Sequence, residues 1–385
     1  MSQYRSNTLN IQDLETPCLL LDINKLEHNI SFLHRRMKEL GVNLRPHGKT
    51  AKNIDVMRMS LKGQSGGITV STIKEAEYYF EQGITDLVYA VGIAPSKLDR
   101  IAGLVGRGAE ITVILDSVEQ IKFLSARAQQ YGLTIPALIE LDCDGHRSGV
   151  TLEDPALLEI ARLLNSEPGV SLSGVLTHAG ESYHCESVEE IRTIAHQERD
   201  VAVGAAEILR RNGLPCPIVS VGSTPTATFA SDLAGVTEVR AGVFLFQDLV
   251  MAGLGVCSVT DIAISVLATV IGHQKQKGWV IIDAGWTALS SDRGTASQRI
   301  DQGYGLVCSA NGEPLSNMIV SITNQEHGII VAREGGEVDW NSFAIGSLVR
   351  VLPNHACAMG TMHDHYHVIN ETGALSHTLP RVNGW

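Results

Sequence analysis

Short apolar runs alternate with longer amphipathic segments over roughly the first two thirds of this 385-residue chain, and this alternation constrains the fold more than any other feature. The apolar runs are about four to seven residues long and the segments between them about ten to fifteen, as in βαβ units. Strands linked in this way pair in parallel. About eight such repeats across residues 18–250 favour a closed (β/α)8 barrel of the α/β class over an open doubly wound sheet.

Hydrophobic periodicity and turn residues locate the individual elements. In the first helix, Leu26, Ile30, Leu33 and Met37 recur at three- and four-residue intervals, and Gly41 follows as a C-terminal stop. Strands are predicted at residues 17–21, 42–44, 67–71, 86–90, 111–115, 136–142, 172–177, 218–221 and 236–245, and helices at 26–37, 73–80, 97–104, 118–131, 157–164 and 188–212.

The pattern changes after Val256. Strand-like runs at residues 262–271, 279–283, 318–323 and 348–352 follow one another without helices between them, which is typical of an antiparallel β domain. We therefore expect a barrel domain over residues 15–255 and a C-terminal antiparallel β domain over residues 256–385, which residues 1–14 would join.

Charge and composition exclude several classes of partner. The net charge is -12 and no long run of either sign occurs, so nucleic acid is not an expected partner. The polar residues 1–5 do not resemble a signal peptide, and no window approaches ~18 uninterrupted apolar residues, so no membrane span is expected. The seven cysteines are odd in number and scattered, without a CxxC pair, as in a chain of reduced thiols with room for one functional exception. These features predict a cytoplasmic protein.

A basic segment at residues 44–52, with the sequence LRPHGKTAK, contains the first candidate residue, Lys49. A lysine forms a Schiff base readily only where burial or neighbouring positive charge lowers its pKa, and Arg45, His47 and Lys52 are such neighbours. Pro46 and Gly48 indicate a strand end, which is where a barrel places its chemistry. The same segment is also compatible with an ordinary basic loop.

Other polar residues follow the predicted strands in the same way. Each has a structural alternative: turn chemistry for residues 142–145, a surface charge for Arg240 and a core histidine for His178. The loop VGSTPT at residues 221–226 is the best phosphate-site candidate, because glycine permits close approach and amides with hydroxyls can bind a dianion, although such a loop is also common without a ligand. The candidates are Asp144, Gly145, His146 and Arg147 after the strand at 136–142, His178 after 172–177, Gly222, Ser223 and Thr224 after 218–221, and Arg240.

Taken together, these motifs resemble the fold-type III, alanine racemase-like pyridoxal-phosphate enzymes, and within them the branch of D-serine dehydratase, D-threonine aldolase and D-threo-3-hydroxyaspartate dehydratase. The stretches 142–150 and 219–226 are most similar to the hydroxyaspartate dehydratases. The matching motifs span nearly the whole chain in order, at residues 16–22, 45–50, 144–149, 177–180, 221–226, 239–242, 324–328 and 353–357.

The resemblance implies a cofactor, pyridoxal 5'-phosphate, and a role for each matching residue. Arg240 matches a position near the pyridine nitrogen, where an arginine would disfavour ring protonation and weaken the electron sink. For the other positions it implies that Lys49 forms the Schiff base and acts as the catalytic base, Arg147 contacts the phenolic oxygen, His178 packs near the pyridine ring, and Gly222, Ser223, Thr224 and Gly242 hold the phosphate.

A second implied group is a divalent metal. His355 and Cys357, at i and i+2 near a predicted strand end, can point the same way and offer nitrogen and thiolate to an ion such as Zn²⁺, with Mn²⁺ as the alternative. In the resembling family a His-x-Cys pair binds a metal beside the cofactor. The neighbouring residues His363, Asp364, His365 and His367 are a competing source of ligands, since alternation would place the three histidines on one strand face.

The implied activity is that of a lyase on a small-molecule β-hydroxy D-amino acid, in a chain that the family suggests is a homodimer. Dehydration of D-threo-3-hydroxyaspartate or D-serine to a 2-oxo acid and ammonia is the preferred reaction, because the resembling aldolases tend to have aspartate where this chain has Cys357. The alternatives are D-threonine aldolase activity, racemisation, which the metal pair disfavours, and a non-catalytic cofactor carrier, which the β domain disfavours.

Overall fold

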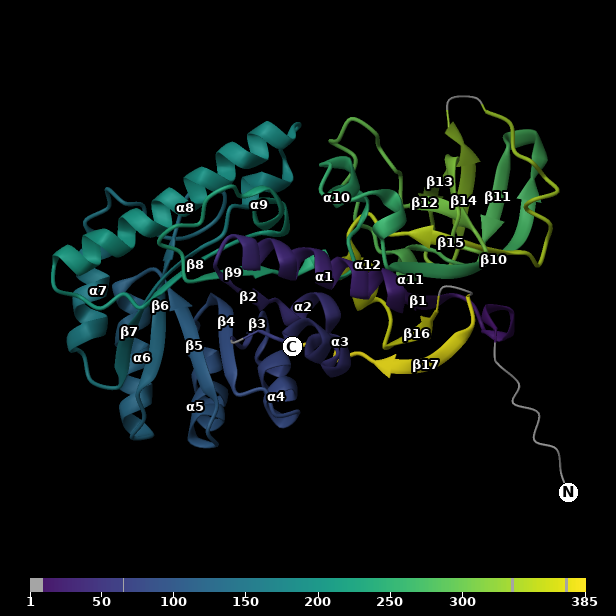
Figure 1. The fold of residues 1–385 in the computed structure, drawn as a ribbon. Helices are drawn as coiled ribbons and strands as arrows, with labels where there is room; N and C mark the ends of the chain where they lie inside the picture. Colours follow the sequence, from purple (N-terminus) through teal and green to yellow (C-terminus); the bar gives the residue numbers. More distant parts are fainter. Residues whose placement is uncertain (1–9, 65, 334–335, 371–372) are drawn as a thin grey trace, which may run out of the picture. The chain divides into compact units, whose positions relative to one another are not determined.

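The computed structural model describes residues 10–64, 66–333, 336–370 and 373–385. The chain divides into two compact units (Figure 1). The barrel unit comprises residues 31–244 with residues 384–385, and the sheet unit comprises the N-terminal segment through Ile30 together with residues 245–383. None of the helices in these described residues is both long enough and apolar enough to cross a membrane.

The barrel unit contains eight parallel strands in the order β2-β9-β8-β7-β6-β5-β4-β3. An isolated parallel bridge between His47 and Thr69 joins the two ends of this order, so the predicted (β/α)8 barrel is confirmed. The strands are β2 (Asn43–Pro46), β3 (Ile68–Val70), β4 (Asp86–Gly92), β5 (Glu110–Leu115), β6 (Ile135–Leu141), β7 (Val170–Thr177), β8 (Ile218–Val221) and β9 (Glu238–Ala241).

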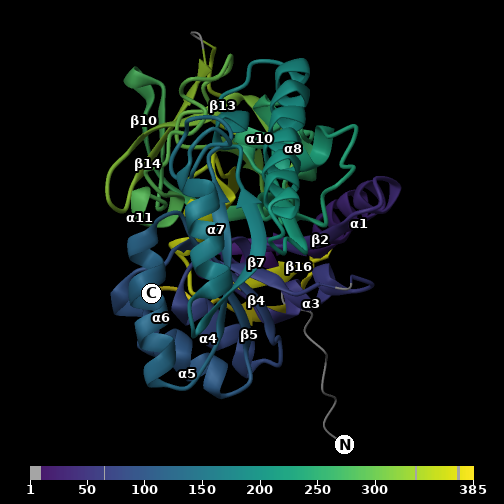
Figure 2. The same cartoon turned by 90° about the vertical axis from the view of Figure 1, so that its left-hand side faces the viewer.

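Helices cover the outside of the barrel strands, as Figures 1 and 2 show for α4 to α8. Side-chain caps define where several begin: Asn53, Thr72, Ser117 and Ser187 each accept a hydrogen bond from a backbone N–H three residues on. The helices are α1 (Ile23–Glu39), which begins in the sheet unit, α2 (Gly48–Ala51), α3 (Ile54–Leu61), α4 (Ile73–Glu81), α5 (Leu98–Gly106), α6 (Val118–Gln130), α7 (Ala156–Ser166), α8 (Val188–Arg211) and α9 (Thr224–Phe229), with 3-10 turns η2 (Pro95–Lys97) and η3 (Gly180–Tyr183).

The sheet unit is built on nine strands in the order β11-β14-β13-β12-β15-β10-β1-β16-β17. β10 also pairs with β11, so six of the strands form a closed circuit. All pairs are antiparallel except β1 with β16. The strands are β1 (Cys18–Asp22), β10 (Ile264–Gln274), β11 (Trp279–Ile282), β12 (Leu306–Ser309), β13 (Pro314–Thr323), β14 (Gly328–Ala332), β15 (Leu348–Leu352), β16 (His365–Ile369) and β17 (Leu375–Pro380).

Short helices complete the sheet unit. They are α10 (Leu249–Gly253), α11 (Trp286–Leu289) and α12 (Ala356–Thr361), with 3-10 turns η1 (Ile11–Asp13), η4 (Val243–Leu245), η5 (Val259–Asp261) and η6 (Lys275–Lys277). One core cluster joins β1 to its neighbours through Cys18, Leu20, Leu267 and Ile369. The segment before β1 contributes Ile11 to this cluster.

The structure differs from the expected domain division at both ends of the barrel. The strand predicted at residues 17–21 forms, but as β1 it pairs with β10 and β16 of the sheet unit. An uninterrupted apolar run indicates burial on both faces, which an interior strand of either sheet satisfies. The strand predicted at 236–245 ends at Ala241, and the unit boundary lies after Phe244 rather than after residue 255.

Candidate active site

Lys49 lies at the carboxyl end of β2, on the short helix α2. The backbone under it is held on both sides: His47 Nδ1 accepts from the Lys49 N–H at 3.4 Å, and the Tyr79 hydroxyl donates to the Gly48 carbonyl at 3.0 Å. A Cβ on Gly48 would come within 2.6 Å of the Tyr79 ring, so only glycine fits there. The Lys49 side chain is exposed while its neighbours Gly48 and Thr50 are buried, so its amine is presented at the catalytic end of the barrel.

Two of the cations expected to act on Lys49 are neutralised by carboxylates. Arg45 is buried between Glu238, with an Nε–Oε2 distance of 2.7 Å, and Asp86, at 2.8 Å. Lys52 Nζ lies 2.6 Å from Oε1 of the buried Glu75. Arg45 and Lys52 therefore stabilise the barrel, and the expectation that they present uncompensated positive charge to Lys49 was wrong.

A different set of charged groups surrounds the site. Burial, together with the charges of Lys49, Arg240 and Arg147, lowers the pKa of His178 to about 3. Burial also holds the pKa of His47 well below its ordinary value, again with Lys49 and Arg240 contributing. Both imidazoles are neutral at physiological pH. The structure thus brings the predicted residues Lys49, Arg147, His178 and Arg240 into one electrostatic neighbourhood.

His178, which follows β7, and Arg240, which lies on β9, are both held by hydrogen bonds on either side of β8. His178 Nδ1 donates to the Gly222 carbonyl at 3.0 Å, which fixes the tautomer of the neutral ring. Arg240 is buried, and its guanidinium donates to the Ser220 hydroxyl at 2.7 Å and to the Thr177 carbonyl at 2.6 Å. The Ser220 hydroxyl in turn donates to Glu238 at 2.7 Å. Arg240 is therefore a fixed internal cation, which rules out its reading as a surface charge.

Arg147 lies in the loop after β6. Its guanidinium is 3.6 Å from Glu140, and its side chain remains 58% exposed, so it is free to contact a ligand. Gly149 turns the loop back along β6: its φ is +116°, a Cβ there would lie 2.4 Å from the Leu141 carbonyl carbon, and its N–H donates to Asp116 at 3.1 Å. Residues 142–149 thus form a turn, which was the structural alternative for residues 142–145. The same turn also carries Arg147.

The loops after β8 and β9 are packed so closely that side chains would not fit. A Cβ on Gly222, where φ is +131°, would lie 2.3 Å from the Arg240 carbonyl oxygen, and one on Gly242 would lie 2.7 Å from Thr50 Oγ1. Ser223 caps α9 by accepting from the Thr226 N–H at 3.2 Å, and the Thr224 hydroxyl accepts from the Phe244 N–H at 3.2 Å. These loops place a helix N-terminus, amides and hydroxyls together, as anion sites do.

A carboxylate that the sequence did not single out supports these loops. Glu198 on α8 is buried and accepts from the Ala179 N–H at 2.9 Å and the Gly222 N–H at 3.0 Å. Burial raises the pKa of Glu198, against the effect of these hydrogen bonds. Because the Gly222 N–H already donates to Glu198, Gly222 contributes to the shape of the loop and not an amide donor to a ligand. Glu198 lies in the middle of a long helix, where no pattern distinguishes it from the other acidic residues of α8.

Pyridoxal phosphate fits this set of residues. An aldehyde requires an accessible amine, which Lys49 has, and an aromatic ring requires a neutral flat neighbour, which His178 offers. A phosphate dianion requires a glycine-lined cradle near positive charge, which the loops after β8 and β9 provide. The structure shows an exposed lysine, a neutral imidazole, and closely packed glycine-containing loops whose hydroxyls lie at the start of α9.

The second predicted pair lies in the sheet unit, and its local structure differs from expectation. β15 ends at Leu352, His355 is the N-cap of α12, and Cys357 lies in the first turn of that helix. Strand alternation therefore does not align the two side chains. They are nevertheless in contact, because a hydrogen bond between the His355 imidazole and the Cys357 side chain contributes to the pKa of His355.

Acidic groups surround His355. Its Nδ1 lies 3.0 Å from Asp292 Oδ2, and the buried Asp248 accepts from the neighbouring Ala356 N–H at 3.0 Å. Burial lowers the pKa of His355, but Asp292, Cys357 and Asp248 outweigh burial and raise it to about 11. The site therefore favours positive charge. An imidazole and a thiol beside an orienting carboxylate fit a divalent metal such as Zn²⁺.

Asp292 was not predicted, and Asn354 shows how its loop is fixed. The buried Asn354 amide donates to the Asp292 carbonyl at 3.1 Å and to the Gly303 carbonyl at 2.7 Å. No periodicity or motif in residues 290–294 points to a carboxylate beside His355, since the two are 63 positions apart in sequence and meet only through the fold.

The competing histidine cluster is only partly assembled. His365 and His367 share one face of β16, with their Nε2 atoms 3.0 Å apart, and His365 also bonds to Asp364. His363 precedes the strand and its Nε2 donates to the Ala288 carbonyl at 3.0 Å. The expectation that alternation would place all three histidines on one strand face was therefore wrong for His363.

Two family models match the chain. The model described as the N-terminal domain of alanine racemase covers residues 21–249, and one described as a serine dehydratase domain covers residues 263–369. The two matches together span most of both structural units.

Known proteins similar to the chain over most of its length include dehydratases and an aldolase. D-threo-3-hydroxyaspartate dehydratase of Delftia sp. (strain HT23) is 48% identical, with 97% of this chain and 98% of that protein covered. D-serine dehydratase of Dictyostelium discoideum is 29% identical, covering 98% and 99%, and 3-hydroxy-D-aspartate aldolase of Paracoccus denitrificans (strain Pd 1222) is 29% identical, covering 92% and 88%.

Solved structures show the same similarity. The Delftia dehydratase superimposes with a TM-score of 0.95 at 47% identity, covering 98% of this chain and 100% of that one. A cysteine-to-alanine mutant of a D-threo-3-hydroxyaspartate dehydratase, solved in the metal-free form, matches with the same TM-score of 0.95.

Proposed function

Because the chain belongs to the alanine racemase-like family of pyridoxal-phosphate enzymes, with a serine dehydratase-type C-terminal domain, we propose that it is a metal-dependent lyase that dehydrates a β-hydroxy D-amino acid. The proposed substrate is D-threo-3-hydroxyaspartate, with D-serine as the next candidate. The observation that carries the proposal is the contact between His355 and Cys357 beside Asp292, which gives the sheet unit a metal-type donor set.

Each unit contributes its own part of the proposed machinery. In the barrel unit, Lys49 holds the cofactor covalently, Arg147 contacts its phenolic oxygen and Arg240 lies near its ring nitrogen. Its phosphate is assigned to the loops with Gly222, Ser223, Thr224 and Gly242. When bound, pyridoxal phosphate supplies an electron sink for the negative charge that develops at the substrate α-carbon.

Lys49 is the proposed base. Its exposed amine would remove the proton from the substrate α-carbon, whereas the lowered pKa values of the neighbouring His47 and His178 make these imidazoles weak bases. His178 stays neutral because burial holds its pKa near 3, so it packs against the ring without adding charge. The buried guanidinium of Arg240 disfavours protonation of a neighbouring nitrogen base.

His355 and Cys357 are the proposed metal ligands, with Asp292 orienting the imidazole. One nitrogen and one thiolate favour Zn²⁺, with Mn²⁺ the alternative. When bound, a divalent metal supplies a Lewis acid that stabilises the departing hydroxide. Loss of water from the substrate, followed by tautomerisation and hydrolysis of the imine, yields a 2-oxo acid and ammonia. The metal-free cysteine mutant of a similar dehydratase supports Cys357 as a ligand.

A retro-aldol reaction is the second candidate. The similar aldolase of Paracoccus denitrificans matches over 92% of this chain and 88% of its own length, which makes that chemistry the runner-up. Its product would be glycine with an aldehyde, after cleavage of the bond between the α- and β-carbons. Cys357 favours dehydration, because the resembling aldolases tend to have aspartate at the second ligand position.

A non-catalytic carrier of pyridoxal phosphate is the candidate of another class. A carrier requires Lys49 and the phosphate loops but has no use for the sheet unit or for the His355 and Cys357 pair, so the presence of both argues against it. Racemisation is disfavoured for the same reason.

A product assay distinguishes these candidates. Purified protein, reconstituted with pyridoxal phosphate, is incubated with D-threo-3-hydroxyaspartate, D-serine and D-threonine in separate reactions, with and without a chelator. We expect a 2-oxo acid and ammonia in equal amounts, lost on chelation and restored by Zn²⁺ or Mn²⁺. Glycine would indicate the aldolase, and no turnover of any substrate would indicate the carrier. Light scattering on the same sample tests the homodimer that we also propose.

A further inference from the structure

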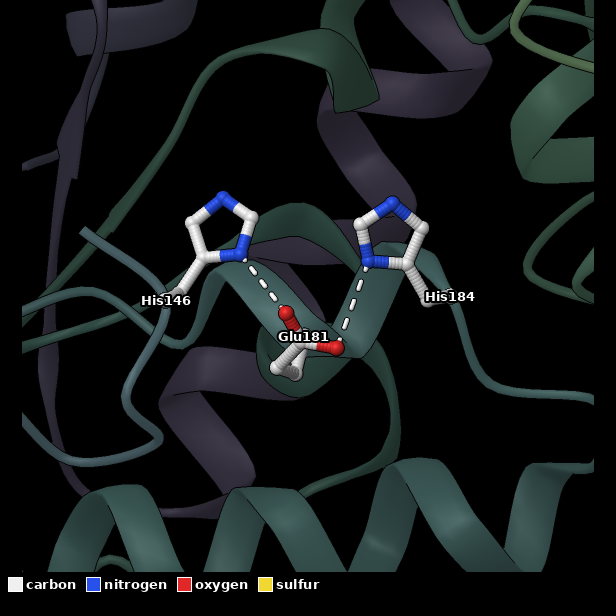
Figure 3. Close-up of side chains that lie close together, drawn as sticks. All are labelled: His146, Glu181 and His184. Atoms are coloured by element: carbon white, nitrogen blue, oxygen red, sulfur yellow. Dashed lines mark hydrogen bonds and ion pairs between the residues drawn. The ribbon is translucent and has the colours of Figure 1, made fainter.

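A second group of metal-type ligands lies in the barrel unit, formed by His146, Glu181 and His184 (Figure 3). Glu181 Oε1 lies 2.8 Å from His146 Nδ1, and Glu181 Oε2 lies 3.4 Å from His184 Nδ1. Figure 3 shows the carboxylate between the two rings, with both imidazoles turned toward it. One atom from each residue lies within 4.8 Å of the others, a condition that no other group of three or more such residues meets in the described parts of the chain.

The three residues come from two neighbouring loops at the carboxyl end of the barrel. His146 follows β6, and Glu181 and His184 lie on and just after η3, which follows β7. Asp144 joins the two loops, because its Oδ1 accepts from the His146 N–H at 3.2 Å and its Oδ2 accepts from the Glu181 N–H at 2.9 Å. The backbone thus sets the spacing of His146 and Glu181 independently of their side chains.

The position of the His146 ring depends on a glycine. A Cβ on Gly180 would lie 2.2 Å from His146 Cδ2, so a larger residue at 180 would displace the imidazole. η3 is itself anchored, since the Ser182 hydroxyl donates to the Ala179 carbonyl at 2.7 Å. The Ser182 hydroxyl also lies 2.8 Å from the Ser223 hydroxyl, in the loop after β8. The ligand group therefore rests on a fixed support.

The donor set has the chemistry of a transition-metal site. Two imidazoles and one carboxylate are the ligands of many zinc sites, with ligand atoms about 2.0–2.2 Å from the ion and therefore about 3.3 Å from one another in a tetrahedral arrangement. The distances of 2.8 Å and 3.4 Å are close to this spacing. The side chains of His146, Glu181 and His184 are 34%, 43% and 59% exposed, so an ion can enter and water can complete its coordination.

We propose that His146, Glu181 and His184 form a second metal site, for a divalent first-row transition ion such as Zn²⁺. It shares no residue with the pair His355 and Cys357, and its ligands are nitrogen and oxygen only. The bound ion would tie the loop that carries Arg147 to the loop that follows His178. The proposal does not rest on the proposed lyase activity, because it needs only these three side chains and their support.

Metal counting on the intact protein tests the proposal. The pyridoxal-phosphate-loaded protein is stripped with chelator, dialysed against buffered Zn²⁺, and its zinc is counted per chain by atomic mass spectrometry. We expect two ions in the wild type and one in each of His184→Ala, Glu181→Gln and Cys357→Ala. The control His28→Ala, which removes an exposed histidine outside both groups, keeps two. Dialysis at graded Zn²⁺ should show affinity at the cluster falling more than ~10-fold in His184→Ala.

X-ray absorption at the zinc edge identifies the remaining ion. In Cys357→Ala we expect a shell of nitrogen and oxygen only, and in His184→Ala a shell that includes sulfur. A wild type that binds one ion, lost in Cys357→Ala and kept in His184→Ala, would overturn the cluster. A second ion that survives the double variant His146→Ala/His184→Ala would be adventitious and would overturn it equally. If instead His355 and Cys357 bind no metal, the ion is kept in Cys357→Ala and lost in His184→Ala. This pattern distinguishes failure of the proposed lyase metal from failure of the cluster.

Discussion

The Nδ1 atom of His355 lies 3.0 Å from the Oδ2 atom of Asp292, a residue that is remote in sequence and outside every motif of the chain. A carboxylate in this position orients a metal-binding imidazole and raises its basicity. We expect Asp292→Asn to lower the Zn²⁺ affinity of the His355 and Cys357 site by ~10–100-fold, measured by equilibrium dialysis. The exposed Asp339→Asn serves as control, and unchanged affinity in Asp292→Asn would show that the carboxylate does not act on the metal.

Lys49 is the single covalent anchor that we propose for the cofactor. We expect Lys49→Ala to abolish the visible absorbance band of protein-bound pyridoxal phosphate and to reduce kcat by at least ~10³-fold, because anchor and base are lost together. The control Lys62→Ala removes an exposed lysine of the same unit and should keep both. A band that persists in Lys49→Ala would assign the covalent attachment to another residue.

Gly222 combines a positive φ with a close backbone contact. In Gly222→Ala the new Cβ would meet the Arg240 carbonyl oxygen at 2.3 Å, in addition to adopting an unfavourable backbone conformation. We expect the free energy of unfolding to fall by more than ~3 kcal/mol and cofactor affinity to weaken. Gly213→Ala is the matched control, since φ is +73° there but nothing lies within 4 Å, so it should cost only about 1–2 kcal/mol of backbone strain. Equal losses in urea denaturation would contradict the steric argument.

The ion pair of Lys52 and Glu75 is buried, with side-chain exposures of 9% and 1%. We expect Lys52→Met to destabilise the protein by about 3–5 kcal/mol, because it leaves the Glu75 carboxylate buried and unpaired. The double variant Lys52→Met/Glu75→Gln should recover a large part of this loss. The exposed pair of Arg192 and Glu189 is the comparison, where Arg192→Met should change the free energy of unfolding by less than about 1 kcal/mol.

His178 makes stability depend on pH. Its pKa is about 3 in the folded protein, against an ordinary value of 6.5, so the unfolded chain binds more protons between these two values. The contribution of His178 to the free energy of unfolding is fully present above pH ~6.5. It falls as the pH drops toward 3, by up to about 1.4 kcal/mol per pH unit. The difference in unfolding free energy between wild type and His178→Asn, followed from pH 7 to pH 5, should shrink accordingly. A difference independent of pH would mean that His178 is not buried as a neutral ring.

The barrel could be predicted from the sequence because its signals are local. Each strand is a short apolar run, each helix has its own periodicity and cap, and their alternation leaves few topologies. The position of Lys49 at a strand's carboxyl end follows from the same alternation. Its electrostatic surroundings do not: the charges of Arg45 and Lys52 are paired by Asp86, Glu238 and Glu75, which no local pattern announces.

What the sequence could not provide depends on contacts between distant segments. The apolar run at residues 17–21 is equally suited to either sheet, and only the pairing with β10 and β16 decides its place. Asp292 and Glu198 act through hydrogen bonds to residues far along the chain. The short helix α12 begins after only three residues of turn, so the start of a helix, and not the strand alternation expected from the sequence, brings His355 and Cys357 together.

The placement of β1 has a consequence for how the protein is made. Its partners β10 and β16 are encoded after the entire barrel, so a chain emerging from the ribosome displays a largely apolar strand long before that strand can pair. The barrel strands β2 to β9, in contrast, are all available as soon as residue 244 has emerged. Domains generally fold as units in the order of their synthesis, and unpaired strands invite aggregation. The nascent chain therefore exposes the apolar residues of β1 until β10 and β16 have been translated.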